Sequence, residues 1–193
     1  MRTTDNRHRS GHRGRLALAA ASGLVLAGCQ TVSLSDLNPF GSSTPEACPP
    51  AATLADAVNI TEFGSGSSRD DSNVIYTATI QRTLFDCQVS AGRVTGRLSV
   101  IGNLDLGRKG KAGRVSLPIF IALTRNDSEI VSKRFETIEV EVAGGSSSAT
   151  FDKAIPDYTF NLGGGEQTLS YEILAGFNLT PEQIDYNRKQ LDG

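Results

Sequence analysis

The sequence predicts an all-β fold, an antiparallel immunoglobulin-like sandwich of seven or eight strands with a short C-terminal helix. Three observations predict it: apolar residues recur at every second position, Gly-rich polar turns separate these segments, and a capped helix start follows the last one. A period of two is typical of strands with one buried face, and many such strands favour a sandwich or a barrel. A closed barrel is the second choice. Because tryptophan is absent, the Cys-Trp-Cys core of antibody domains cannot form, and the expected likeness is one of architecture.

The cleanest strand runs from Arg93 to Leu106. Polar residues alternate there with an apolar face, and Ile101 is the one exception. The residues of that apolar face are Val94, Gly96, Leu98, Val100, Gly102, Leu104 and Leu106. This alternation predicts a half-buried antiparallel strand.

Other segments repeat the pattern more briefly. Strands are expected at 74–80, 115–123, 138–142, 151–155 and 169–177, with a weaker one at 55–63. Glycine and short polar residues mark the turns between them. These turns are expected at 64–73, 107–113, 126–128, 144–148 and 163–165.

The chain ends on a helix signal. Thr180 precedes Pro181, and Gln183 follows three residues after the threonine. A threonine cap, a proline at the first helical position and a glutamine closing a capping box predict a helix from about residue 181. Because a helix of about ten residues is marginal alone, we expect Ile184 to pack against the sandwich.

The N-terminal segment has the parts of an export signal. Five arginines precede an uncharged stretch from Leu16 to Ala27, which runs into Leu26-Ala27-Gly28-Cys29. A positive start, a short apolar run and small residues before a cleavage point are typical of such signals. The run is too short for a spanning helix. A secreted protein cut at another position is the alternative.

The four residues Leu26-Ala27-Gly28-Cys29 resemble a bacterial lipobox, in which diacylglycerol alkylates the cysteine that becomes the new N-terminus. The resemblance implies that Cys29 is an anchor holding the chain on a membrane. In the proteobacterial sorting rule an aspartate after that cysteine favours the inner membrane. Gln30 therefore predicts an outer-membrane protein that faces the periplasm, and the inner membrane and the cell surface are less favoured.

Three regions follow from these signals. Residues 1–28 are the expected signal peptide, and residues 29–47 are the acylated cysteine and a tether. The tether is rich in serine, proline and glycine, which have little to bury. Residues 48–193 are the expected sandwich domain with its C-terminal helix.

Composition excludes several functions for the part after residue 28. The chain has 19 basic and 21 acidic residues, and residues 1–28 hold five arginines and Asp5, so the remainder has a net charge of about −6. A mildly acidic domain is poorly suited to nucleic acid. Both histidines, His8 and His12, lie in the signal. Histidine-based catalysis and imidazole metal sites are therefore excluded. We expect no catalytic residues, no metal and no cofactor, although lysine or carboxylate chemistry stays open.

Two cysteines remain after the anchor. Cys48 and Cys87 would reach an oxidising compartment, where paired cysteines normally form a disulfide. We expect a Cys48–Cys87 bridge, and two free buried thiols are the alternative.

One charge cluster is a candidate binding patch. Four positive residues lie in or next to the loop after the best strand, and two arginines on the outward face of that strand are candidates to extend it. The six are Arg108, Lys109, Lys111, Arg114, Arg93 and Arg97. Such a loop can contact anionic headgroups or an acidic partner. A solvated hairpin with charges that discourage edge pairing is the favoured interpretation.

The tail from Gly176 to Arg188, GFNLTPEQIDYNR, resembles the ending of uncharacterised lipoproteins from alphaproteobacteria. The likeness extends back through Cys87 to Cys48-Pro49. It supports the lipid anchor and implies no activity, because that family has no catalytic residues to carry over.

Together these patterns predict a non-catalytic, membrane-anchored module of the bacterial cell envelope that binds another envelope protein. The alternative is a periplasm-facing carrier that holds a lipid or small apolar ligand between its sheets. A cavity of several hundred cubic ångströms would favour the carrier. A close-packed interior would favour the interaction module.

Overall fold

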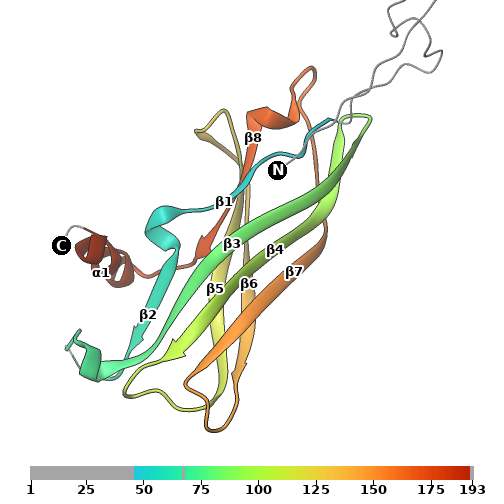
Figure 1. Ribbon diagram of the computed structural model, residues 1–193. Helices are drawn as coiled ribbons and strands as arrows, with labels where there is room; N and C mark the ends of the chain where they lie inside the picture. Colours follow the sequence, from blue (N-terminus) through green and yellow to red (C-terminus); the bar gives the residue numbers. More distant parts are fainter. Residues whose placement is uncertain (1–45, 67, 192–193) are drawn as a thin grey trace, which may run out of the picture. The chain divides into compact units, whose positions relative to one another are not determined.

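The computed structural model describes residues 46–66 and 68–191, and these form two four-stranded β-sheets packed face to face (Figure 1). The sandwich that the sequence predicts is confirmed, and the described residues form no closed barrel. The strands are β1 (Ala51–Thr53), β2 (Asn59–Phe63), β3 (Val74–Ser90), β4 (Arg93–Leu106), β5 (Gly113–Arg125), β6 (Glu129–Val142), β7 (Ser148–Asn161) and β8 (Tyr171–Phe177).

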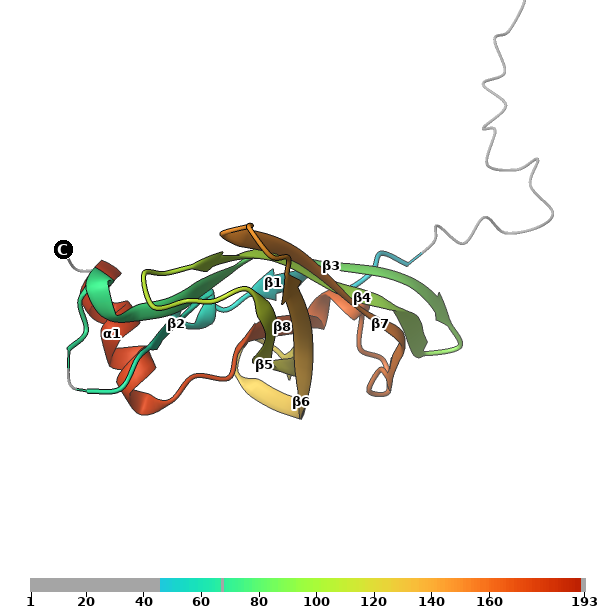
Figure 2. The same ribbon diagram turned by 90° about the horizontal axis from the view of Figure 1, so that it is seen from below.

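The first sheet has the strand order β1-β8-β5-β6, and the second has the order β2-β3-β4-β7 (Figure 2). All pairs are antiparallel except β1 with β8, which is parallel. The long hairpin of β3 and β4 places Ser90 and Arg93 at one end of the second sheet and Leu106 at the other.

The core lies between the sheets and follows the predicted alternation. Side chains from β4 fill it from the second sheet, and side chains from β5 and β8 fill it from the first. Fully buried members include Leu98, Val100, Leu104, Leu117, Ile119 and Ile173. Burial of one face, as along β4, is what produces the period of two in the sequence.

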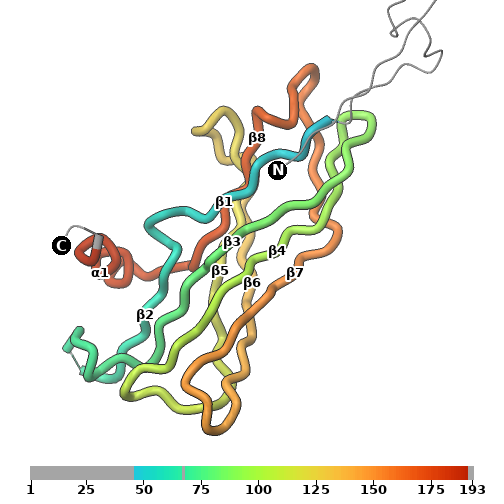
Figure 3. Tube along the Cα trace, viewed as in Figure 1, coloured from blue at the N-terminus to red at the C-terminus, as the bar shows by residue number. Residues whose placement is uncertain are grey.

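The predicted strand at 55–63 is a strand only in its second half, as β2, and its first half is a 3-10 turn at Ala55–Ala57; the short strand β1 before it was not predicted. The backbone amide of Leu54 donates to the carbonyl of Ala175, which ends the contact with the first sheet. The chain then crosses to the second sheet, and this change of sheet requires a turn (Figure 3). Further 3-10 turns lie at Asp71–Asn73 and Thr168–Ser170.

Helix α1 (Pro181–Leu191) begins as predicted. The Thr180 amide donates to the Gln183 side-chain oxygen at 3.0 Å, and the Gln183 amide donates to the Thr180 hydroxyl at 3.3 Å. These reciprocal bonds are the capping box that the sequence indicates. Ile184 is half-buried, which agrees with its expected packing against the sandwich.

The signal peptide, Cys29 and nearly all of the expected tether lie outside the described residues. The described part begins at Glu46, two residues before the expected start of the domain. Within that part, α1 is too short and too polar to span a bilayer.

Candidate functional site

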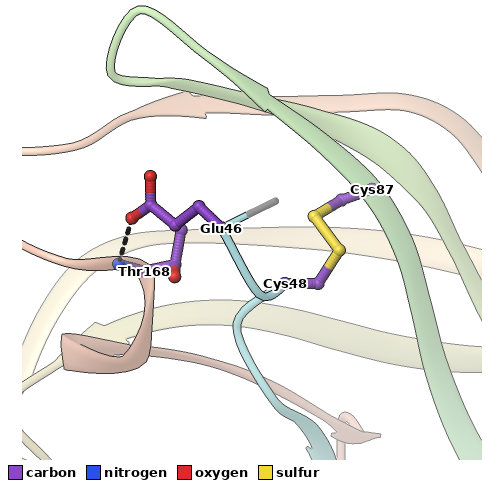
Figure 4. Close-up of a disulfide and its surroundings, with 4 residues drawn as sticks. All are labelled: Glu46, Cys48, Cys87 and Thr168. Atoms are coloured by element: carbon purple, nitrogen blue, oxygen red, sulfur yellow. Dashed lines mark hydrogen bonds between the residues drawn. A yellow bond between two sulfur atoms is a disulfide. The ribbon is translucent and has the colours of Figure 1, made fainter. Parts of the chain in front are cut away.

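The chain is fastened to the sandwich where its described part begins. Cys48 and Cys87 form the expected disulfide, with their Cα atoms 5.8 Å apart (Figure 4). The buried amide of Thr168 donates a hydrogen bond of 3.0 Å to the carboxylate of Glu46. The start of the domain is therefore joined both to β3 and to the turn before β8.

β1 continues this connection between the sheets. It pairs with β8 in the first sheet, and the Thr53 hydroxyl hydrogen-bonds the Thr83 hydroxyl of β3 at 2.9 Å. β2 pairs only with the Val74–Thr79 part of β3, and β1 lies beside a later part of β3, around Thr83 (Figure 1). β1 thus closes one edge of the sandwich next to the point where the chain reaches it.

A charged cluster stabilises the loop beside that point. Glu166 accepts hydrogen bonds from the Tyr171 hydroxyl and from Arg125, whose other nitrogens bind Glu129. The Tyr171 hydroxyl, followed by the Arg125 guanidinium, holds the pKa of the Glu166 carboxyl below its usual value. The same oxygen of Tyr171 accepts from the Gly163 amide at 2.9 Å. The side chains of Arg125, Glu166 and Tyr171 thus hold the loop before β8 in place.

The structure does not bring the six predicted patch residues together. Arg108, Lys109 and Lys111 are exposed in the loop after β4. Arg97 lies on β4 nine residues before Leu106, and a rise of about 3.3 Å per residue separates it from that loop by roughly 30 Å. Arg93 lies farther still, beside the β3–β4 turn.

Arg114 is in an ion pair with Glu141, with its Nε atom 3.6 Å from the carboxylate. Its charge is therefore compensated within the domain. The candidate patch is reduced to the three loop cations. These lie at the end of the sandwich opposite to Cys87 and the β3–β4 turn.

An apolar groove of about 420 Å³ lies on the outer face of the first sheet. Phe120 and Ala122 of β5 and Leu174 of β8 form its floor. Phe120 and Ala122 alternate with core residues of β5, so their side chains point away from the main core. With Ala57 they make a second, smaller apolar cluster. We refer to this feature as the outer groove.

Two different walls border the outer groove. Leu54 and Ile184, from the end of β1 and from α1, contribute to one wall, and Ile130 and Lys133 of β6 form the other. Gly176 keeps the floor close to the first wall, because a Cβ there would lie 2.7 Å from the Ala57 Cβ. The helix is held beside the groove by an ion pair of 3.1 Å between Arg188 and Asp56.

One cation of the outer groove has no acidic partner among the described residues. The Lys133 ammonium lies 4.5 Å from the ring centroid of Phe120 and 5.3 Å from that of Phe135. No described carboxylate lies within ion-pair distance of it. Two aromatic faces thus hold a cation beside an apolar surface.

Sequence reasoning missed the outer groove, although a signal was present. In β5 the residues from Ile119 to Leu123 are all apolar, without the alternation seen in β4. A continuous apolar run indicates a strand with both faces covered. Only its odd-numbered residues entered the expected core, and Phe120 and Ala122 lie on the other face.

Among residues 46–66 and 68–191, no three metal-binding side chains cluster closely enough to hold an ion. Asp70, from the loop with paired aspartates, uses its carboxylate to accept from the Ser72 amide at 2.9 Å. Burial, followed by the charge of Glu62, raises the pKa of Tyr76 to about 12.

Comparison with protein-family models, with curated proteins and with solved structures finds no match for this chain. Its function therefore has to be argued from the residues themselves.

Proposed function

We propose that this chain is a lipid-anchored protein of the bacterial cell envelope, with Cys29 as its acylated anchor. The single observation that carries the proposal is Leu26-Ala27-Gly28-Cys29 at the end of an uncharged stretch that follows five arginines. Two or more acyl chains on one residue anchor a protein stably. Gln30 favours the outer membrane, with the domain facing the periplasm.

The disulfide supports export. Cys48–Cys87 joins the start of the domain to β3, and such bonds form and persist outside the reducing cytoplasm. A chain held at Cys29 would transmit any pull from the membrane to the domain at Glu46 and Cys48. Both residues are fastened to the sandwich there, by a hydrogen bond and a covalent bond.

The sandwich acts, in this proposal, as a non-catalytic module that binds another envelope protein. The absence of histidine after residue 12 leaves no imidazole base. Core residues of the two sheets, such as Leu98 on β4 and Ile119 on β5, are fully buried, which favours an interaction module over a carrier with a ligand between the sheets. The outer groove supports the second candidate function, the binding of a small apolar ligand.

Cross-linking in intact cells tests the proposed partner. A photoreactive amino acid is placed in turn at Arg97, Lys109 and Phe135, which are exposed on different parts of the surface. We expect a discrete protein adduct from one position and not from the others. Membrane-anchored, folded chain that yields no adduct from any of these positions, nor with a general amine cross-linker, would contradict the interaction role.

A further inference from the structure

The two outer faces of the sandwich differ in chemical character. On the second sheet, β4 presents polar residues outward, among them Thr95, Arg97 and Asp105. On the first sheet, β5 and β8 present Phe120, Ala122 and Leu174 outward, and these form the floor of the outer groove. A solvated sheet face is normally polar. A concave apolar surface with a few polar groups is typical of a ligand site.

The size and the lining of the outer groove suit a small apolar molecule. Its volume of about 420 Å³ lies within the range of roughly 300–1,000 Å³ for small-molecule sites. Leu54 and Ile130 stand on opposite walls and stay largely exposed, with 42% and 64% of their surfaces open to solvent. A bound aliphatic chain would remove these side chains and the floor from water.

The charges of the outer groove indicate a ligand with one negative charge. Arg188 and Asp56 neutralise each other through bonds of 3.1 and 3.3 Å. Lys133 remains, with no described carboxylate within ion-pair distance of it and with its ammonium 4.5 Å from the centroid of the Phe120 ring. One uncompensated positive charge beside an apolar floor complements a monoanion whose remaining part is apolar.

We propose that the outer groove binds a single aliphatic carboxylate, a free fatty acid. The chain lies over Phe120, Ala122 and Leu174, and the carboxylate accepts hydrogen bonds from the Lys133 ammonium. This site is separate from the core between the sheets, and it goes beyond the anchor and the protein partner proposed above.

The absence of tryptophan from the chain allows a site-specific test with dodecanoate as the probe. Leu54→Trp places the reporter in the outer groove, and Leu84→Trp is the matched control on the second sheet. The two leucines have similar exposure, 42% and 48%. Both variants are prepared in the full chain with Cys29→Ser. We expect saturable dodecanoate binding that shifts the emission of Leu54→Trp to the blue and leaves Leu84→Trp unchanged.

The charge of Lys133 is tested in the Leu54→Trp background. Lys133→Gln is expected to weaken dodecanoate binding about tenfold, since it removes a charge-assisted hydrogen bond. Lys109→Gln, in the distant loop, should leave the affinity unchanged. Dodecyltrimethylammonium has the same chain with a positive head and should bind at least about tenfold more weakly than dodecanoate.

Four results would overturn the proposal. One is a folded Leu54→Trp chain that does not respond to dodecanoate. A second is an affinity that Lys133→Gln leaves unchanged, and a third is equal binding of the two headgroups. The fourth is an emission shift that depends on protein concentration and not on dodecanoate, which would assign the groove to a second copy of the chain.

Discussion

The side-chain amide of Asn187 donates a hydrogen bond of 2.8 Å to the backbone carbonyl of Asn59 and another of 3.3 Å to the carbonyl of Asp56. Asn187 is 9% exposed, so its side-chain amide makes both hydrogen bonds from a largely buried position. The helix α1 is therefore held on the β1–β2 connection by a polar contact as well as by apolar packing. The T-shaped pair of Tyr186 and Phe63 adds to it, with ring centroids 5.1 Å apart.

Replacing Asn187 should destabilise the fold measurably. Asn187→Leu leaves two carbonyls without their donor, and we expect a loss of about 1–3 kcal/mol in the free energy of unfolding. Urea denaturation of the full chain measures it. The control is Asn161→Leu, which changes an exposed residue and should have an effect within about 0.5 kcal/mol. Equal stability of both variants would show that the contact is not a stabilising one.

Reduction of Cys48–Cys87 should lower stability. The two residues are separated by 39 positions, and closing a loop of this length is worth about 4 kcal/mol on the chain-entropy model. We expect the urea midpoint of the Cys29→Ser chain to fall when reductant is added. Thiol titration of the same chain, unfolded without reductant, should detect no free thiol. Detection of two would contradict the disulfide.

Stability should depend on pH through Glu166. Its pKa is lowered in the folded state, so its contribution is present above the unfolded pKa and is lost as the pH falls through the folded pKa. The difference in unfolding free energy between wild type and Glu166→Gln should be largest near pH 7 and should narrow below about pH 4.3.

Glu141→Gln is the matched control for Glu166→Gln, because Glu141 is in an exposed ion pair with Arg114. Such pairs contribute little. A pH dependence of Glu141→Gln equal to that of Glu166→Gln would refute the role given to the Tyr171 and Arg125 contacts.

Membrane association should not require the basic loop. Arg108, Lys109 and Lys111 lie at the end of the sandwich opposite to Cys87, and the proposed anchor is Cys29. Reversal of all three charges to glutamate should leave the membrane-bound fraction of cell extracts unchanged. Release of the charge-reversed protein into the soluble fraction would show instead that the loop holds the protein on the membrane.

Much of the fold could be predicted because strands such as β4 bury one face. Val94, Leu98, Val100 and Leu104 alternate in the sequence and are fully buried in the structure. The start of the helix could also be predicted from the sequence, since the Thr180–Gln183 capping box depends on neighbouring residues alone. Such local signals identify elements well.

Other features depend on contacts between distant segments. Three residues, Ala51–Thr53, are too few to show a period, so the parallel pairing of β1 with β8 could not be predicted. Asn187 is a polar residue that gives no sign of its buried partners. The predicted charge patch was wrong for a related reason. Arg97 and Lys109 are close in sequence, but most of the length of β4 separates them.

Acylation of Cys29 is tested most directly by metabolic labelling with an alkynyl fatty acid in cells that express the full chain. We predict a labelled protein in the membrane fraction, no label on Cys29→Ser, and retained label on Cys87→Ser. An unlabelled wild-type chain in the soluble periplasmic fraction would contradict the lipid anchor and the envelope role that depends on it.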